Sequence, residues 1–138
     1  MSLFQSEYEL MISFEDLDPM NVVWHGNYLR YMEQARFNMF NKLGYSYQDF
    51  GTDNYAYPVA KMNIKYIKPA KLGDVLTVKT EIISAEPTLD IKYVIYNKKT
   101  QDKILEASTM QIAINTDTKE SKYYAPERLK QKLGLNDG

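Results

Sequence analysis

Apolar and polar residues alternate near the start of the chain, from Phe4 to Phe14. One face of this segment carries Phe4, Ser6, Tyr8, Leu10, Ile12 and Phe14, and the other carries Gln5, Glu7, Glu9 and Glu15. Successive side chains of a β-strand point to opposite faces of its sheet. The pattern therefore predicts a strand that is buried on one face only.

The next apolar pattern has a helical period. Five residues recur at spacings of four, three, four and four: Tyr28, Met32, Ala35, Met39 and Leu43. Leu29, Arg36 and Phe40 widen this apolar side, and Gly44 stands where a helix commonly ends. Glu33 lies three residues before Arg36, a spacing that favours an ion pair within the helix. The sequence predicts a long amphipathic helix that is largely buried.

Strand patterns return in the second half of the chain. Their alternating apolar residues are Met62, Ile64 and Tyr66; Leu76, Val78, Thr80 and Ile82; Leu89, Ile91, Tyr93 and Ile95; and Met110, Ile112 and Ile114. Polar breaks at 69–74 and 97–102 separate runs of this kind, so we expect an antiparallel meander. Pro126 followed by Leu129, Leu133 and Gly134 predicts a short terminal helix.

The order of elements is one strand, one long helix and then four strands. An α+β domain in which one sheet wraps across one helix buries the apolar face of every element. We expect residues 1–138 to form this single domain. The edge strands of such a sheet stay exposed unless a second copy covers them, so a homodimer is a natural hypothesis.

The amino-acid composition argues against several classes of function. Seventeen basic and eighteen acidic side chains give a net charge of −1, without the basic excess that nucleic-acid binding requires. The absence of cysteine excludes disulfides, thiolate metal sites and a cysteine nucleophile, and the one histidine is a poor basis for a metal site. No basic leader and no apolar run of about 20 residues is present. We expect a cytoplasmic protein without a membrane span.

The candidate chemistry lies in the segment from Asp16 to Tyr28, where a loop with two carboxylates leads into the predicted helix. Backbone N–H groups at a helix start can hold an anion or a developing oxyanion. Asp18 lies seven residues before His25, at the expected helix start. A carboxylate and preorganised donors suit the hydrolysis of an activated acyl group. The plainer alternatives are a turn capped by Asp18 and a core position for Trp24.

Two blocks of the sequence together resemble a known family. The first reads Asp18-Pro19-Met20-Asn21-Val22-Val23-Trp24-His25-Gly26-Asn27-Tyr28, and the second reads Tyr66-Ile67-Lys68-Pro69-Ala70-Lys71-Leu72-Gly73-Asp74. Both resemble the signature of the 4-hydroxybenzoyl-CoA thioesterase branch of the hotdog superfamily. Two blocks in the predicted order of elements are a specific signal. The resemblance covers nearly all of the chain and implies a hotdog fold.

The resemblance also implies roles for particular residues. It makes Asp18 the carboxylate that attacks the thioester carbonyl or activates water for that attack. It makes the backbone N–H of His25 the donor to the carbonyl oxygen, and it places Val23, Trp24, Gly26 and Tyr28 at the substrate. Lys61, Lys92 and Lys122 are candidates for contacts to the coenzyme A phosphates.

For the whole protein, the resemblance implies hydrolysis of acyl-CoA or acyl-carrier-protein esters without a metal or an organic cofactor. The family's site lies between two subunits, which implies a homodimer and often a dimer of dimers.

The main departure from the family pattern is Asn21, which stands where glycine is usual. If this position needs a positive φ, asparagine is the residue best able to replace glycine. The departure is the main support for an alternative, a non-catalytic hotdog module that binds acyl groups or proteins. A hydratase or dehydratase ranks last, because we expect such an enzyme to pair a histidine with a carboxylate from another helix position.

Overall fold

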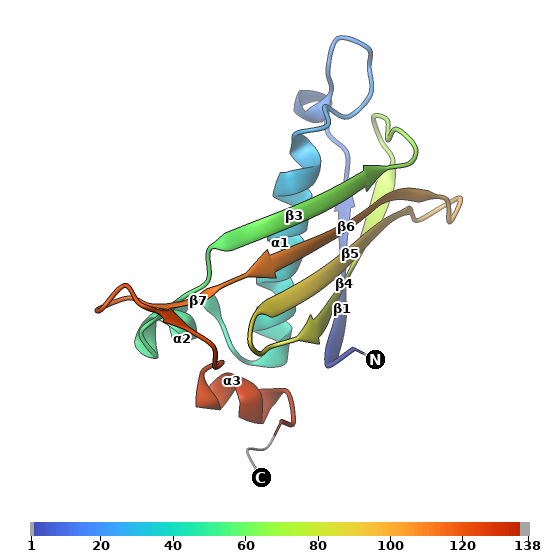
Figure 1. The fold of residues 1–138 in the computed structure, drawn as a ribbon. Coiled ribbons are helices and arrows are strands. Elements are labelled where there is room, and N and C mark those ends of the chain that lie inside the picture. The colour runs from blue at the N-terminus through green and yellow to red at the C-terminus, as the bar shows by residue number, and fades with distance from the viewer. Residues whose placement is uncertain (1, 136–138) are drawn as a thin grey trace.

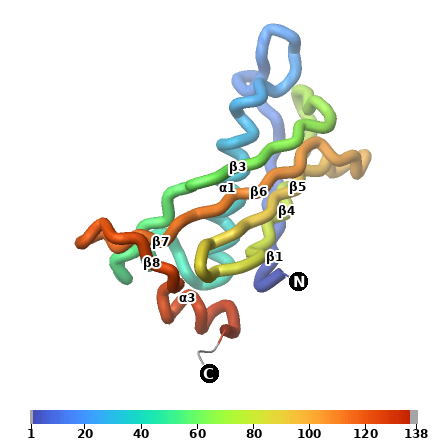
Figure 2. Tube along the Cα trace, viewed as in Figure 1, coloured from blue at the N-terminus to red at the C-terminus, as the bar shows by residue number. Residues whose placement is uncertain are grey.

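The computed structural model describes residues 2–135, which form an antiparallel sheet lying across one long helix (Figure 1). The sheet has the strand order β1-β4-β5-β6-β3, with β1 at Phe4–Met11, β3 at Val59–Tyr66, β4 at Val75–Ser84, β5 at Leu89–Asn97 and β6 at Lys103–Gln111. A small second sheet joins β2 (Tyr55–Ala56), β7 (Ala113–Asn115) and β8 (Ser121–Lys122), as Figure 2 shows for the last two. The helices are η1 (Phe14–Asp16), α1 (Asn27–Leu43), α2 (Tyr47–Thr52) and α3 (Glu127–Lys132). The predicted α+β architecture is confirmed.

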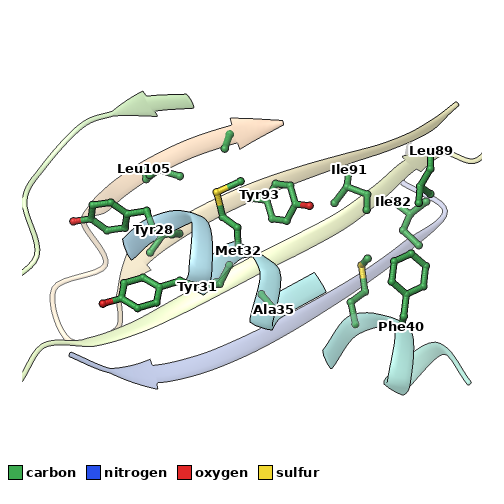
Figure 3. Close-up of a cluster of buried hydrophobic side chains, with 14 of the residues drawn as sticks. Tyr28, Tyr31, Met32, Ala35, Phe40, Ile82, Leu89, Ile91, Tyr93 and Leu105 are labelled. Carbon is green, nitrogen blue, oxygen red and sulfur yellow. The ribbon is translucent and has the colours of Figure 1, made fainter. Parts of the chain in front are cut away.

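Helix α1 forms the core with the sheet, as its apolar period predicted. All five residues of the predicted stripe are buried, and Phe40 from the second stripe is buried with them. Figure 3 shows the side chains of Tyr28, Met32 and Phe40 between the helix and the strands of the sheet. Gly44 ends the helix at φ 89°, a left-handed conformation that glycine adopts readily.

The expected strand faces are correct for most of β1, β4 and β5. Phe14 is an exception: it begins the η1 turn after β1 and is 79% exposed. The face expected for Met110 and Ile112 is also wrong. In β6 the alternate residues Leu105, Ala107 and Thr109 are buried, whereas on the face of Met110 only Ile104 is buried. An apolar residue on the outer face of a sheet gives the same local alternation as one on the inner face.

The strands form a meander only from β4 to β6. The chain reaches β3 first, and β3 pairs with β6 at the far edge, with Val59 opposite Gln111 and Tyr66 opposite Leu105. Every residue of β3 except Ile64 is exposed, so the expected buried face through Met62 and Tyr66 is not formed within one chain. None of the helices in residues 2–135 is long and apolar enough to cross a membrane.

Candidate active site

A closed turn holds Asp18 in the loop between β1 and α1, which is at the top of Figure 1. The Asp18 amide donates to the carbonyl of Val22 at 2.8 Å, and the Asn21 amide donates to the carbonyl of Asp18 at 3.0 Å. The Asp18 Oδ1 atom accepts from the Met20 amide at 2.8 Å. Aspartate followed by proline is a favoured start for such a turn. One oxygen of Asp18 therefore shapes the loop, and no described residue donates a hydrogen bond to the other.

Asn21 closes this turn with φ 63°. A turn followed by one residue in the left-handed region is a common way to close a short loop, and glycine usually takes that place. Asparagine populates this region more readily than other non-glycine residues. The condition under which sequence reasoning allowed asparagine to replace glycine, a positive φ, is met. Asn21 can therefore stand in place of the family's glycine in this conformation, which weakens the main support for the non-catalytic alternative.

Substitutions at Asn21 test this conformational account. Asn21→Gly is expected to leave stability nearly unchanged, whereas Asn21→Val is expected to lower the free energy of unfolding by about 1–2 kcal/mol, because a β-branched residue is strained at this φ. Urea denaturation of both variants measures the difference. Equal stability of the two variants would contradict the account.

Asp16 connects the loop to the start of α1. The residue is only 4% exposed. Its Oδ2 accepts from the amide and hydroxyl of Ser13 at 3.1 Å each, and its other oxygen pairs with Arg30 on α1. Its carbonyl accepts from the Trp24 amide at 2.9 Å and from Asn27 Nδ2 at 2.8 Å. Sequence reasoning gave Asp16 no role. The signal was present, since two carboxylates stand two residues apart in a segment that already carried the candidate chemistry.

The surroundings of Asp16 stabilise its charged form. Burial alone raises the pKa of this carboxyl, but the hydrogen bonds from Ser13 and the charge of Arg30 lower it overall. The folded-state pKa is therefore below the ordinary value. Asp16 contributes stability above the unfolded-state pKa, and this contribution is lost as the pH falls through the folded-state pKa.

Asp16→Asn is expected to lower the free energy of unfolding at pH 7 by about 1–3 kcal/mol, because a buried charge-assisted network loses its acceptor. The difference between variant and parent is expected to shrink as the pH falls below the folded-state pKa of Asp16. Urea denaturation from pH 7 down to acid measures both effects. The exposed Asp117→Asn is the matched control, and a pH-independent difference at Asp16 would contradict the electrostatic account.

The start of α1 offers a free backbone donor. The helix begins at Asn27, and no side chain caps its N-terminus. The Asn27 amide donates to the carbonyl of Trp24 at 2.9 Å, whereas the His25 amide donates to no described residue. The first N–H groups of a helix lack partners within the helix, so this amide is available to a ligand. A Cβ atom on Gly26 would lie 2.3 Å from the Trp24 ring, so glycine allows that ring to lie over the backbone.

An open depression of about 250 Å³ lies beside this helix start. Three residues from the first sequence block line it, Val23, His25 and Tyr28, together with Tyr66, Ile67, Lys68 and Pro69 from the second block. The structure thus brings together three of the six predicted site residues. Asp18, Trp24 and Gly26 are not among the residues that line this depression, and the Trp24 side chain is half exposed.

The second sequence block docks onto the first through Ala70. The Val23 amide donates to the Ala70 carbonyl at 2.9 Å, and the Ala70 amide donates to the hydroxyl of Tyr28 at 3.3 Å. Burial raises the pKa of Tyr28, which keeps its phenol protonated. The rings of Tyr66 and His25 pack edge to face at 6.2 Å. These contacts explain why the two blocks belong to one site although they are far apart in the sequence.

Lysines lie both beside the depression and on the outer face of the sheet. Lys68 lines the depression and pairs with Asp102 at 3.2 Å, a position that sequence reasoning did not single out. Lys61 and Lys92 line a broad hollow of the sheet, whereas the ammonium of Lys122 lies 4.9 Å from the Tyr55 ring centre. Within residues 2–135, no group of three or more His, Cys, Asp or Glu side chains is placed to hold a metal ion.

Comparisons with known proteins agree with this architecture. The chain is 35% identical over 81 residues to the acyl-CoA thioester hydrolase YbgC of Escherichia coli O6:H1, a match that spans 59% of this chain and 60% of YbgC. It is 28% identical over 111 residues to the 1,4-dihydroxy-2-naphthoyl-CoA hydrolase of Crocosphaera subtropica, spanning 78% of this chain and 81% of that protein.

A solved structure matches most of the fold. The DHNA-CoA thioesterase of Staphylococcus aureus superposes with a TM-score of 0.82 at 29% identity, covering 94% of this chain and 91% of that chain. This likeness confirms the expected hotdog fold. The thioesterase-like superfamily matches residues 12–133, which include both sequence blocks and the helix between them. The chain therefore belongs to the thioesterase-like superfamily.

Proposed function

We propose that the chain hydrolyses acyl-CoA thioesters to a free carboxylic acid and coenzyme A. The observation that carries this proposal is the start of α1, where the His25 amide has no described partner and the Asp18 turn lies directly upstream. The names of the relatives support the proposal, because each acts on a coenzyme A ester. The first relative matches over only 60% of its length, so it supports the reaction class rather than one substrate.

The amide of His25 acts on the carbonyl oxygen of the thioester. This oxygen gains negative charge when a nucleophile adds to the carbonyl carbon, and a fixed N–H donor stabilises that charge without having to reorganise. Such a donor typically contributes about a hundredfold to a thousandfold in rate. The rings of Tyr28 and Tyr66 and the side chain of Val23 surround the acyl group in the adjoining depression.

Asp18 supplies the carboxylate of the reaction. In one route, its oxygen adds to the carbonyl carbon, the C–S bond breaks, and water then hydrolyses the resulting anhydride. In the other route, Asp18 takes a proton from water while the water oxygen adds to the carbonyl carbon; the C–S bond then breaks, and the leaving thiolate takes up that proton. Both routes release the thiol and the acid. The Met20 amide that binds Asp18 Oδ1 keeps the carboxylate from turning away from the loop.

The substrate carrier is coenzyme A in this proposal, and acyl-carrier protein is the alternative carrier. Lys68 lies at the depression and is the cation best placed for a phosphate of the carrier. The proposed reaction uses no metal ion and no organic cofactor, because a carboxylate and a backbone donor suffice for attack on a thioester.

A second copy of the chain completes the site in this proposal. The unpaired edge of β3 exposes Val59, Met62 and Tyr66 along a strand of eight residues. Such an edge is a template for another strand. Antiparallel pairing of two copies centred on β3 continues the sheet across both chains. It also brings the Val59 end of one copy beside the Tyr66 end, and so the depression, of the other copy.

Light scattering on the purified protein is expected to give at least twice the mass of one chain. Met62→Lys is expected to shift the mass toward one chain, because pairing of the two edges would bring the two introduced charges together. Lys122→Gln, on the small second sheet, is the control and should keep the parent mass. A monomeric parent would contradict the β3 pairing.

The experiment that tests the proposed reaction is thiol release from a panel of short, long and aromatic acyl-CoAs. We expect turnover of at least one member, and an acyl-carrier-protein ester of the same acyl group tests the alternative carrier. Failure to release thiol from any acyl-CoA, by a folded protein that also leaves the carrier-protein ester intact, would overturn the proposal.

A further inference from the structure

Two hydrogen-bond donors that flank His25 in the chain meet at one backbone oxygen. The Trp24 amide donates to the Asp16 carbonyl at 2.9 Å, and the Asn27 Nδ2 atom donates to the same carbonyl at 2.8 Å. Asp16 stands two residues before Asp18, so these bonds close the chain from the Asp18 turn to the start of α1 into one loop. Both groups of the proposed reaction, the Asp18 carboxylate and the His25 amide, belong to that loop.

The direction of the His25 amide is set by the carbonyl of the preceding residue. In a trans peptide, the C=O group and the following N–H group lie in one plane and point in opposite directions. The Trp24 carbonyl accepts from the backbone amide of Asn27 at 2.9 Å, which directs this carbonyl toward the first turn of α1. The N–H of His25 therefore points away from that turn, where it can donate to a ligand.

Asn27 makes both of the contacts that set this geometry. Its side chain joins the first residue of α1 to the loop at Asp16, and its backbone amide holds the Trp24 carbonyl. The side chain of Asp16 pairs in addition with Arg30, the fourth residue of the same helix. Because the loop is tied to the helix at these points, the spacing between the His25 amide and the Asp18 turn is fixed before a substrate binds.

We propose that Asn27 is a positioning residue for thioester hydrolysis. Its side-chain amide keeps the His25 N–H directed at the thioester oxygen while Asp18 faces the carbonyl carbon, and Asn27 itself touches no reacting atom. A displacement of about 1 Å between reacting groups can cost about a hundredfold in rate. The role assigned to Asn27 rests on the proposed function, because it requires the His25 amide to act on the thioester.

Asn27→Ala removes the side-chain donor and keeps the backbone amide. The Asp16 carbonyl retains its bond from Trp24, so no acceptor is left without a partner and the melting temperature should fall by only a few degrees. We expect kcat for acyl-CoA hydrolysis to fall about tenfold to a hundredfold with KM nearly unchanged, because the misplaced donor acts in the transition state. Asn41→Ala, at an exposed position of the same helix, is the control and should keep the parent kcat.

Asn27→Asp separates positioning of the amide from stabilisation of the helix. Aspartate has nearly the shape of asparagine, and a negative charge in the first turn is favourable for a helix. Its carboxylate cannot donate to the Asp16 carbonyl. We therefore expect Asn27→Asp to stay folded, as thermal melting would show, and to lose kcat at least as strongly as Asn27→Ala. A parent-like kcat in both variants would overturn the role of Asn27.

The most specific experiment combines Asn27→Ala with His25→Pro, which removes the amide that Asn27 positions. Thiol release from one acyl-CoA gives kcat for the parent, the two single variants and the double variant. If Asn27 acts through the His25 amide, Asn27→Ala lowers kcat by about threefold or less in the His25→Pro background, since the two losses are then not additive. A purely structural role predicts the same fold loss in both backgrounds.

The outcomes separate the role of Asn27 from the proposed reaction. Turnover by the parent with equal fold losses in the two backgrounds would overturn the role of Asn27 and leave the hydrolysis in place. A folded parent that releases no thiol from any acyl-CoA would overturn the proposed hydrolysis and the role of Asn27 together.

Discussion

Asp18→Asn is expected to lower kcat for acyl-CoA hydrolysis by about a hundredfold to ten-thousandfold, the range associated with removing an acid–base group. The amide of asparagine neither attacks a thioester nor accepts a proton from water at neutral pH. The turn itself should survive, because an asparagine oxygen can still accept from the Met20 amide as Asp18 Oδ1 does. KM is expected to change much less than kcat, since Asp18 acts mainly in the transition state.

Two controls make the Asp18 result interpretable. Asp117→Asn removes an exposed carboxylate from the turn between β7 and β8 and should keep the parent kcat. Circular dichroism and urea denaturation should give the same fold and nearly the same stability for Asp18→Asn and the parent. An Asp18→Asn enzyme that is folded and retains the parent kcat would remove Asp18 from the mechanism.

His25→Pro is expected to lower kcat by about a hundredfold to a thousandfold, because proline has no N–H to donate to the developing oxyanion. Proline is tolerated near a helix start, where the amide lacks a partner within the helix. His25→Ala keeps the amide and removes only the ring that contacts Trp24 and Tyr66. We therefore expect His25→Ala to retain most of the parent activity.

The comparison of these two variants identifies which part of His25 acts. Steady-state thiol release measures kcat and KM for both, and thermal melting verifies that each is folded. Equal losses in both variants would assign the effect to the imidazole ring. Full activity in the proline variant would show that the backbone donor does not contribute.

The sequence predicted most of the core because the buried residues recur at the spacing of a helix or a strand. The stripe of α1 and the alternation in β4 and β5 each bury the residues that the pattern places on one face. The same reasoning failed at β3 and β6. Strand β3 lies at the edge of the sheet, and its alternating apolar residues stay exposed within one chain. In β6, Met110 lies on the outer face of the sheet rather than on the face that meets the helix. Local alternation identifies a strand but not which of its faces meets the helix.

The sequence predicted those parts of the candidate site that depend on residues close together in the chain. The turn at Asp18 and the positive φ of Asn21 follow from residue types within a few positions of each other. The roles of Asp16 and Tyr66 depend on contacts with Arg30 and His25, which lie on other elements.

The ion pair expected between Glu33 and Arg36 is not formed among residues 2–135. Arg36 instead donates to the hydroxyl of Tyr47 on α2 at 3.2 Å and to the hydroxyl of Tyr93 on β5 at 2.9 Å. Sequence spacing carries no information about such contacts.

The central claim is that this chain cleaves acyl thioesters at the Asp18 loop and the start of α1. Its most direct test measures the free thiol and the carboxylic acid released from one acyl-CoA by the parent and by Asp18→Asn, in parallel and at equal enzyme concentration. The account predicts equal amounts of both products from the parent and almost none from the variant. Equal release by the two proteins, or none by the parent on any acyl-CoA, would contradict it.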